Sequence, residues 1–228
     1  MANTDAQSTV SAVVNQLLNG LTPTTPYLPL WVKNDLYESR IKPLLDFSTG
    51  QNKCSLSRVP RTARWGEGQL QSILCINNSP VKICVVGELQ TLIAAIDMPK
   101  DMATTTVRLE LFTDGDKANF DAALNLSQNV NVQIPYHFEC ARVDRRRKRF
   151  FAGAYDGTDG ANHSTNLRPI SLQELSAGDI VQVETIFVRE DRSTRADGNQ
   201  QRLWWKYSTR FALVQITLVA RRPSDAHD

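Results

Sequence analysis

The sequence has no run of about 18 uncharged apolar residues, so no segment is long enough to form a membrane-spanning helix. Its polar opening, Met1–Asp5, lacks the basic and apolar regions of a secretory signal, and we therefore expect an intracellular protein. The four cysteines contain no CxxC pair, which favours reduced, structural thiols. With 11 glycines and 10 prolines, the composition excludes a collagen-like chain and a wholly disordered one.

The sequence motifs of common enzymes are also missing. There is no GxxxxGKS/T, HExxH, GxSxG or GxGxxG motif, and no HxE followed by CxxC. His137 and Cys140 form the only close His and Cys pair, and an offset of three on a strand points two side chains to opposite faces. Asp179 and Glu184 are the carboxylates that a metal-dependent nuclease would use, but single acids near a strand usually serve in capping or solvation. We therefore expect no enzymatic activity, no cofactor and no metal.

The charge is nearly balanced overall but is unevenly distributed. The 228 residues carry 26 basic and 24 acidic side chains, a net charge of +2, which suits one large or two small soluble domains. Between Ala141 and Arg222 there are 15 Lys and Arg against 9 Asp and Glu, whereas the rest of the chain has 11 against 15. This excess indicates either a polyanionic partner or a solvated, salt-bridged face.

The first 68 residues are expected to be an appendage of helical and extended segments. Apolar residues at helical spacing between Ser8 and Leu18 predict a helix, and three prolines then predict an extended connector. Short helices are expected between Trp31 and Leu45, with a break at Pro43. The appendage has too few apolar residues for a core of its own, so it packs on the rest of the chain or on a partner. Residues 69–222 form the main domain, and residues 223–228 a flexible acidic tail.

In the main domain the hydrophobic period changes from 3.6 towards 2, which predicts a mainly β fold. Gly87 lies inside the first expected strand and indicates a bulge or bend. Residues 130–140 also alternate. The expected strands are 81–93, 104–112, a basic strand near 149–155, 179–189 and 203–220, with one or two helical turns at 120–126 and a short helix at 171–175 after a capping box.

A first cluster of basic and aromatic residues suggests a nucleic-acid-binding surface. Arginine and lysine neutralise phosphates, and aromatic rings on a strand stack on unpaired bases. A nuclear-import signal or a solubilising hairpin would have the same composition. Adjacent phenylalanines on a strand face opposite ways, so one belongs to the core. The cluster consists of Arg142, Arg145, Arg146, Arg147, Lys148, Arg149, Phe150 and Phe151.

A second such cluster follows a polar connection at residues 190–201. Two adjacent tryptophans lie within it, and one of them is expected to be buried while the other meets solvent or a ligand. The alternative is that the tryptophan side chain on the outward side covers the sheet beneath the N-terminal helices. The cluster consists of Arg189, Arg192, Arg195, Arg202, Trp204, Trp205, Lys206, Tyr207 and Arg210.

The order of expected elements, β-β-β-α-β-β, resembles the oligonucleotide-binding (OB) fold. The segment Leu175-Ser-Ala-Gly-Asp-Ile-Val-Gln-Val-Glu resembles the entry to the fourth strand of replication protein A-like OB modules, and Trp205-Lys-Tyr-Ser-Thr-Arg-Phe-Ala-Leu-Val resembles the closing strand of uncharacterised fungal, mobile-element-linked OB-like proteins. The resemblance covers residues 80–220. It implies an OB-like β-barrel that binds across strands 2 and 3, between the loops joining strands 1–2 and 4–5. A long insertion between strands 2 and 3, Thr113–Arg142, departs from the minimal barrel.

Together these patterns favour a non-enzymatic protein that binds single-stranded nucleic acid with little sequence preference. Of the two nucleic acids, we expect DNA as the ligand in preference to RNA. The basic run suits a nuclear protein, and the N-terminal helix has an apolar stripe that would support a homo-oligomer. The alternative is a structural or assembly protein such as a jelly-roll viral coat subunit. Coat arms that meet nucleic acid are usually basic, however, and residues 1–32 contain no Lys or Arg.

Overall fold

The computed structural model describes residues 26–49, 52–60, 62–97, 102–125, 137–145, 151–159, 167–191 and 207–225. Within these residues the protein is mainly β, as expected from the sequence, and most of its strands belong to one mixed sheet. The helix expected near Ser8–Leu18 lies outside the described residues.

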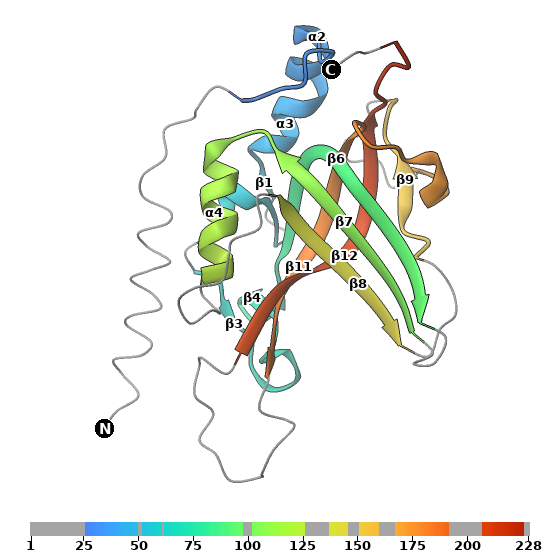
Figure 1. Cartoon of the computed structure of the whole chain (residues 1–228). Coiled ribbons are helices and arrows are strands. Elements are labelled where there is room, and N and C mark those ends of the chain that lie inside the picture. Colours follow the sequence, from blue (N-terminus) through green and yellow to red (C-terminus); the bar gives the residue numbers. More distant parts are fainter. Residues whose placement is uncertain are drawn as a thin grey trace.

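Five long strands form a ring (Figure 1). They are β6 (Lys82–Asp97), β7 (Met102–Leu111), β8 (Phe138–Arg145), β11 (Ile180–Asp191) and β12 (Tyr207–Ala220). Antiparallel pairs join β6 to β7, β7 to β8, β12 to β11 and β11 back to β6. The remaining contact, between β8 and β12, is parallel. The strand order around the ring is therefore β6-β7-β8-β12-β11-β6.

Alternating burial explains why these segments are strands. In β7, Val107 and Leu109 are buried and Arg108 between them is exposed. In β11, Val181 and Val183 are completely buried. Because side chains alternate across a strand, one set of residues faces the interior of the ring and the other faces outwards. The strands expected at 104–112 and 179–189 are confirmed.

Shorter strands extend this framework at its margins. A parallel contact joins β2 to the start of β6, and another joins β9 to the end of β12. A separate small sheet of three strands lies beside β11, to which an isolated bridge connects it. The short strands are β1 (Ser48–Thr49), β2 (Lys53–Ser55), β3 (Arg64–Trp65), β4 (Leu74–Ile76), β5 (Ser79–Pro80), β9 (Ala154–Asp156) and β10 (Arg168–Pro169).

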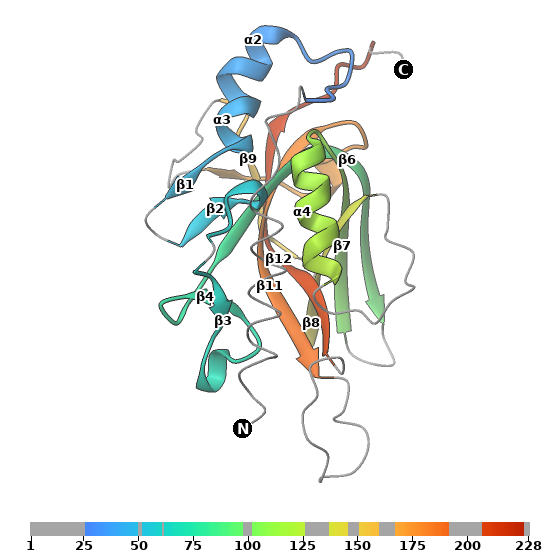
Figure 2. The same ribbon diagram turned by 90° about the vertical axis from the view of Figure 1, so that its left-hand side faces the viewer.

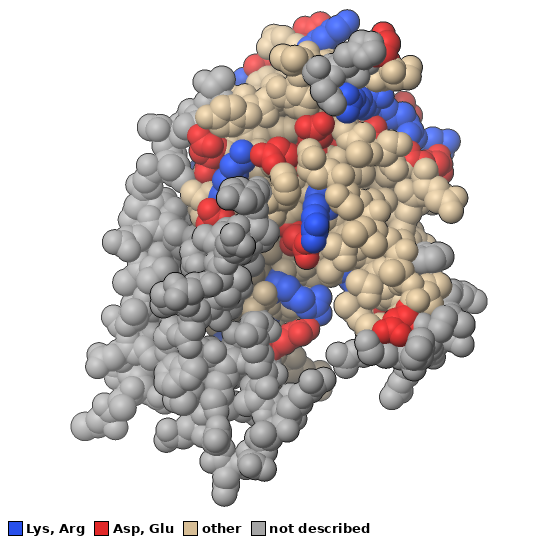
Figure 3. Space-filling view, in the orientation of Figure 1, with Lys and Arg blue, Asp and Glu red and all other residues tan. Residues whose placement is uncertain are grey.

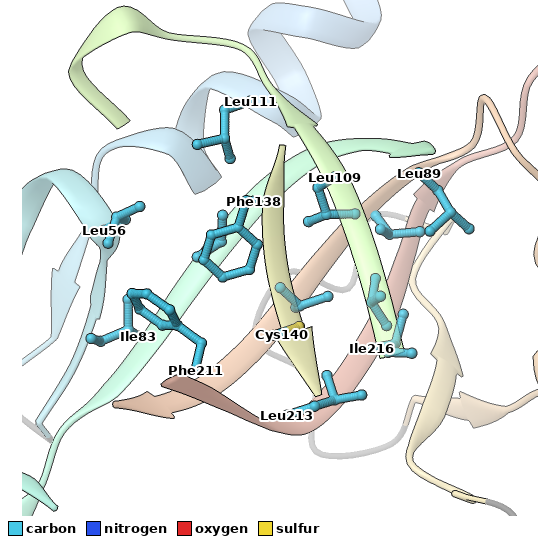
Figure 4. Packing of buried hydrophobic residues seen from close by; sticks show 14 of the residues in the cluster. Leu56, Ile83, Leu89, Leu109, Leu111, Phe138, Cys140, Phe211, Leu213 and Ile216 are labelled. Atoms are coloured by element: carbon cyan, nitrogen blue, oxygen red, sulfur yellow. The ribbon is translucent and has the colours of Figure 1, made fainter. Parts of the chain in front are cut away.

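Aliphatic side chains and a group of phenylalanines fill the interior of the ring (Figure 4). The ring of Phe211 lies 4.9 Å from that of Phe138 and 4.8 Å from that of Phe187. Phe120 comes from helix α4 (Asp114–Asn125) and lies 5.0 Å from Phe138, so this helix covers one opening of the ring (Figure 2). Aromatic pairs at these distances stabilise a core beyond the area they bury.

A second, smaller core lies beneath the N-terminal helices. The helical run begins with α2 (Asn34–Leu36), continues as a π-helix, η1 (Tyr37–Ile41), and ends with α3 (Lys42–Leu45). Ile41 and Leu44 are buried there against residues of β6 and β12. This part of the expected appendage therefore packs on strands of the ring. The expected division of the chain at residue 68 stays a prediction.

Three short 3-10 helices complete the described elements: η2 (Leu56–Arg58), η3 (Gly68–Leu70) and η4 (Leu172–Glu174). The capping box expected before η4 is present, since Ser171 accepts a hydrogen bond from the backbone of Gln173 and Glu174 accepts one from the backbone of Ser171. All four cysteines are buried free thiols, in agreement with the sequence.

Three expectations about the elements need correction. The third strand of the ring is β8, and the described part of the basic segment near 149–155 contributes only to the three-residue strand β9. The helix after β7 is longer than the turns expected at 120–126. The register shift in β6 falls between Leu89 and Thr91, so the bulge expected at Gly87 is not there. Gly87 instead permits close contact between strands, because a Cβ there would lie 2.5 Å from the carbonyl oxygen of Glu110.

Candidate nucleic-acid interface

The outer face of β7 and β8 belongs to the second and third strands of the ring, although the sequence had placed the third strand near residues 149–155. Its charged residues come from both strands and pair with each other or with residues beside them. Arg108 donates a hydrogen bond from Nε to Oε2 of Glu139 at 2.7 Å. Glu110 lies 2.9 Å from Nζ of Lys117 and 2.8 Å from Nδ1 of His137. Over these strands the described basic groups accordingly lie beside acidic ones and form no basic patch of their own (Figure 3).

Beyond these ion pairs, the same face is uncharged and made of small side chains. Thr106 lies opposite Ala141, and Thr104 opposite Val143, which is 37% exposed. The outward positions of β7 and β8 from Met102 to Glu110 and from Glu139 to Val143 contain no aromatic residue. This strip can lie against an extended ligand, but rings that stack on bases would have to come from elsewhere.

Arg142 and Phe151 contact each other on the inner side of β8. The guanidinium of Arg142 lies 5.4 Å from the centre of the Phe151 ring and also pairs with Asp144 at 2.9 Å. Phe151 is only 8% exposed and belongs to the main core. It is therefore the core member of the Phe150–Phe151 pair, which leaves Phe150 as the stacking candidate; Phe150 lies outside the described residues.

Arg145 is the last residue of β8, and its backbone pairs with Met102 at the start of β7. The basic run thus begins where β8 ends, next to the connection between β6 and β7. The other members of that run, Arg146, Arg147, Lys148 and Arg149, lie outside the described residues.

Arg189 holds the small sheet against β11. Its guanidinium lies 4.6 Å from the centre of the Trp65 ring, and its Nε donates to the carbonyl oxygen of Gln71 at 2.9 Å. Trp65 also stacks on Phe187, with 5.7 Å between ring centres. The sequence interpretation missed Trp65 because no periodic pattern surrounds it. In this structure, Arg189 is committed to an internal contact.

Arg210 on β12 also has protein partners. Its Nε donates to Oε1 of Glu190 at 2.9 Å, and its Nη1 to the carbonyl oxygen of Ala141 at 3.4 Å. The backbone of Tyr207 pairs with Asp191 at the end of the β11–β12 hairpin. The remaining members of the second cluster, Arg192, Arg195, Arg202, Trp204, Trp205 and Lys206, lie outside the described residues.

Strand directions show how the two clusters relate to the outer face of β7 and β8. In the parallel contact, Phe211 of β12 lies opposite Cys140 of β8. The start of β12 is therefore on the side where β8 begins, whereas Arg145 is where β8 ends. Among the described residues, the start of β12 and Arg145 therefore lie towards opposite ends of β8, whereas Arg210 reaches the carbonyl oxygen of Ala141, next to Arg142.

The two carboxylates that a nuclease would use each have their own partners. Asp179 accepts backbone hydrogen bonds from Ser176 and Arg222, each at 2.9 Å. Glu184 is buried between Lys53 at 2.7 Å and Lys82 at 2.8 Å. Burial alone would raise the pKa of Glu184, but the hydrogen bonds and charges of these two lysines outweigh it and lower the pKa.

Metal ligands do not gather in the described part of the chain, where no three His, Cys, Asp or Glu residues are placed to hold an ion. His137 and Cys140, the close His and Cys pair in the sequence, point in different directions as expected: His137 faces Glu110, and Cys140 is buried in the core. None of the helices in the described ranges is long and apolar enough to cross a membrane. No protein-family model and no curated protein matches the chain.

Proposed function

We propose that the protein binds single-stranded nucleic acid, DNA in the first instance, without catalysis and with little sequence preference. The observation that carries this proposal is the order of the five strands in the ring. Numbered along the chain, β6, β7, β8, β11 and β12 are strands 1 to 5, and they pair in the order 1-2-3-5-4-1. The contact between strands 3 and 5 is parallel and the others are antiparallel. This order and these directions support the interpretation of the ring as an OB-like barrel.

The OB interpretation assigns the ligand to the outer face of β7 and β8. Oligonucleotides bind OB folds across strands 2 and 3, between the loops that join strands 1 to 2 and 4 to 5. Here those loops are residues 98–101 and 192–206. The small, uncharged residues of the face leave room for an extended strand to lie along it. The basic run at 145–149 follows directly from the end of β8.

Within this proposal, affinity comes from the segments that flank the face. Arg108 and Arg210 already pair with carboxylates, so phosphate contacts fall to the basic residues at 145–149 and 192–206. Trp204 or Trp205, and Phe150, would stack on bases and contribute about 1–3 kcal/mol for each base. The insertion that contains α4 lies between strands 2 and 3 and covers an opening of the ring, and its Lys117 pairs with Glu110 at one end of this face.

A titration of fluorescein-labelled oligo-dT, followed by fluorescence anisotropy, tests the proposal. Binding is expected at low salt and should weaken steeply as salt is added, because each phosphate contact releases counterions. A variant with Arg146, Arg147 and Lys148 changed to Gln should bind more weakly. Its slope of log Kd against log salt should fall by about 2, or about 0.7 for each lost phosphate contact.

A matched control removes three charges from other parts of the surface. Lys33, Lys42 and Arg64 are exposed and lie outside the five strands of the ring. Changing these three residues to Gln alters the net charge equally but should leave the salt slope unchanged. If the wild type does not bind at low salt, or if both variants lose affinity equally, the proposal is wrong.

Assembly into a coat remains the second interpretation of the sequence, but the strand order does not favour its jelly-roll form. Jelly rolls are built from antiparallel strands. The main sheet here contains parallel contacts at β8–β12, β9–β12 and β2–β6. Nuclear localisation is likewise proposed only from the run at 145–149, and imaging of the same triple variant in cells would test it.

A further inference from the structure

Strand β6 has one neighbour along its second half, whereas its first half has a strand on either side. From Lys82 to Glu88 it pairs with β11, and from Gly87 to Asp97 it pairs with β7 on its other side. The last contact on the β11 side is between Leu89 and the backbone of Gly178 and Asp179. From Gln90 to Ile96, no described residue pairs with the second edge of the strand. We call this segment the free half of β6; it lies at the margin of the sheet (Figure 1).

The free half of β6 lacks the features that usually protect an edge strand. Natural edges carry lysine, proline or inward-pointing charges that prevent pairing with another chain. Residues 90–96 read Gln-Thr-Leu-Ile-Ala-Ala-Ile and contain neither charge nor proline. The one register shift of β6 comes before Thr91, where the strand leaves β11. Seven residues span about 23 Å, which is long enough for a stable ladder of hydrogen bonds.

Apolar side chains are exposed along this edge. Ile93 is 48% exposed, and Ala94 and Ala95 are exposed as well. On the outer face, Ile93 lies next to Thr106 of β7, and Ala95 next to Thr104. The uncharged strip of the β7–β8 face therefore continues without interruption to the edge of the sheet.

The segment is also complementary to itself. When two copies pair antiparallel about a two-fold axis at Ile93 or at Ala94, the outer faces of both sheets lie on the same side. Ile93 then meets either the second Ile93 or Ala95. The nearest charged residue, Asp97, lies at opposite ends of the pairing in the two copies, so like charges do not face each other.

We infer that the free half of β6 pairs antiparallel with the same segment of a second copy of this chain. The two sheets then form one continuous sheet, with the two outer β7–β8 faces side by side. This dimer requires only the described backbone edge and its apolar residues, so it does not depend on the proposed nucleic-acid binding.

Sedimentation velocity of the full chain across the micromolar range is the first test. The wild type should sediment as a species of twice 25.6 kDa. Ile93→Lys places a charge at the edge and should raise the dimer Kd at least about tenfold, because like charges then meet across the two-fold axis. Val143→Lys is the matched control: it adds the same side chain to an exposed position on the same face, away from the edge, and should leave the dimer intact.

A disulfide experiment tests the register without depending on dimer affinity. Ile93→Cys or Ala94→Cys should form an intermolecular disulfide under mild oxidation, since residues opposite each other on antiparallel strands are close enough to be bridged. Val143→Cys should not. The four native cysteines are buried and should react little in the folded protein.

Two results would overturn the inference. The first is a wild-type monomer throughout the micromolar range, with no disulfide at position 93 or 94. The second is a dimer that Ile93→Lys leaves intact but that a charged substitution in the predicted N-terminal helix, Val14→Glu, dissociates; the interface would then be in that helix.

Discussion

Replacing the buried carboxyl of Asp116 should make the stability of the protein less dependent on pH. Asp116 lies in the first turn of α4 and is only 4% exposed. Burial raises its pKa to about 6, although a hydrogen bond from the Thr113 hydroxyl at 2.8 Å acts in the opposite direction. The ordinary value is 3.8. The folded state therefore holds this proton at pH values where the unfolded chain has already lost it.

The sign of the effect follows from this difference. Below pH 3.8 the acid is neutral in both states, so it causes no change in stability with pH. Between 3.8 and about 6 only the unfolded state ionises, so the free energy of unfolding falls as the pH rises. Above about 6 the loss is complete. A difference of about two pKa units corresponds to about 3 kcal/mol.

Asp116→Asn cannot ionise and should escape this loss. We expect the difference in unfolding free energy, variant minus wild type, to rise by up to about 3 kcal/mol between about pH 4 and pH 8. Urea denaturation followed by circular dichroism at several pH values measures it. Asp114→Asn removes a charge from the same helical turn and serves as the comparison. A difference for Asp116→Asn that stays constant with pH would refute the reasoning.

Three further substitutions test other parts of the structure, each through the free energy of unfolding in urea. Glu184→Gln should destabilise the protein by about 2 kcal/mol. This is less than for a fully buried ion pair, because both lysine partners are partly exposed. An unchanged free energy of unfolding would mean that these two ion pairs contribute nothing to stability. Gly87→Ala should cost about 1–3 kcal/mol because its Cβ would overlap the Glu110 carbonyl, and a neutral effect would show that the strands can separate. Trp65→Ala should cost about 2 kcal/mol by removing the stack on Phe187 and Arg189, whereas Trp65→Phe should recover part of the loss.

Strands with one clearly buried face were predictable from the sequence. β7 and β11 alternate between apolar and polar residues over part of their lengths, and both were assigned within a few residues of their ends. β8 was misplaced because Arg142 and Asp144 occupy inward positions near the end of the strand. They pair with each other there, so apolar alternation stops while the strand continues.

The partners of the candidate site residues could not be read from the sequence. Arg189 stacks on Trp65, which is far away in the chain and becomes its neighbour only when the small sheet packs on β11. Arg210 meets Glu190 because the β11–β12 hairpin brings them together. Composition counts charges, but only the register between strands determines which of them are neutralised.

The parallel contact between β8 and β12 is the shortest pairing between neighbouring strands of the ring. It consists of two residue pairs, Phe211 with Cys140 and Ala212 with Ala141, whereas β11 and β12 are paired along their whole lengths. Because the backbone pairing is shortest here, amide hydrogens at this junction should exchange with solvent before those of the β11–β12 hairpin. Separation of β8 from β12 would open the ring at this junction. The five strands would then form one curved, open sheet, while the β6–β7 and β11–β12 hairpins remain folded.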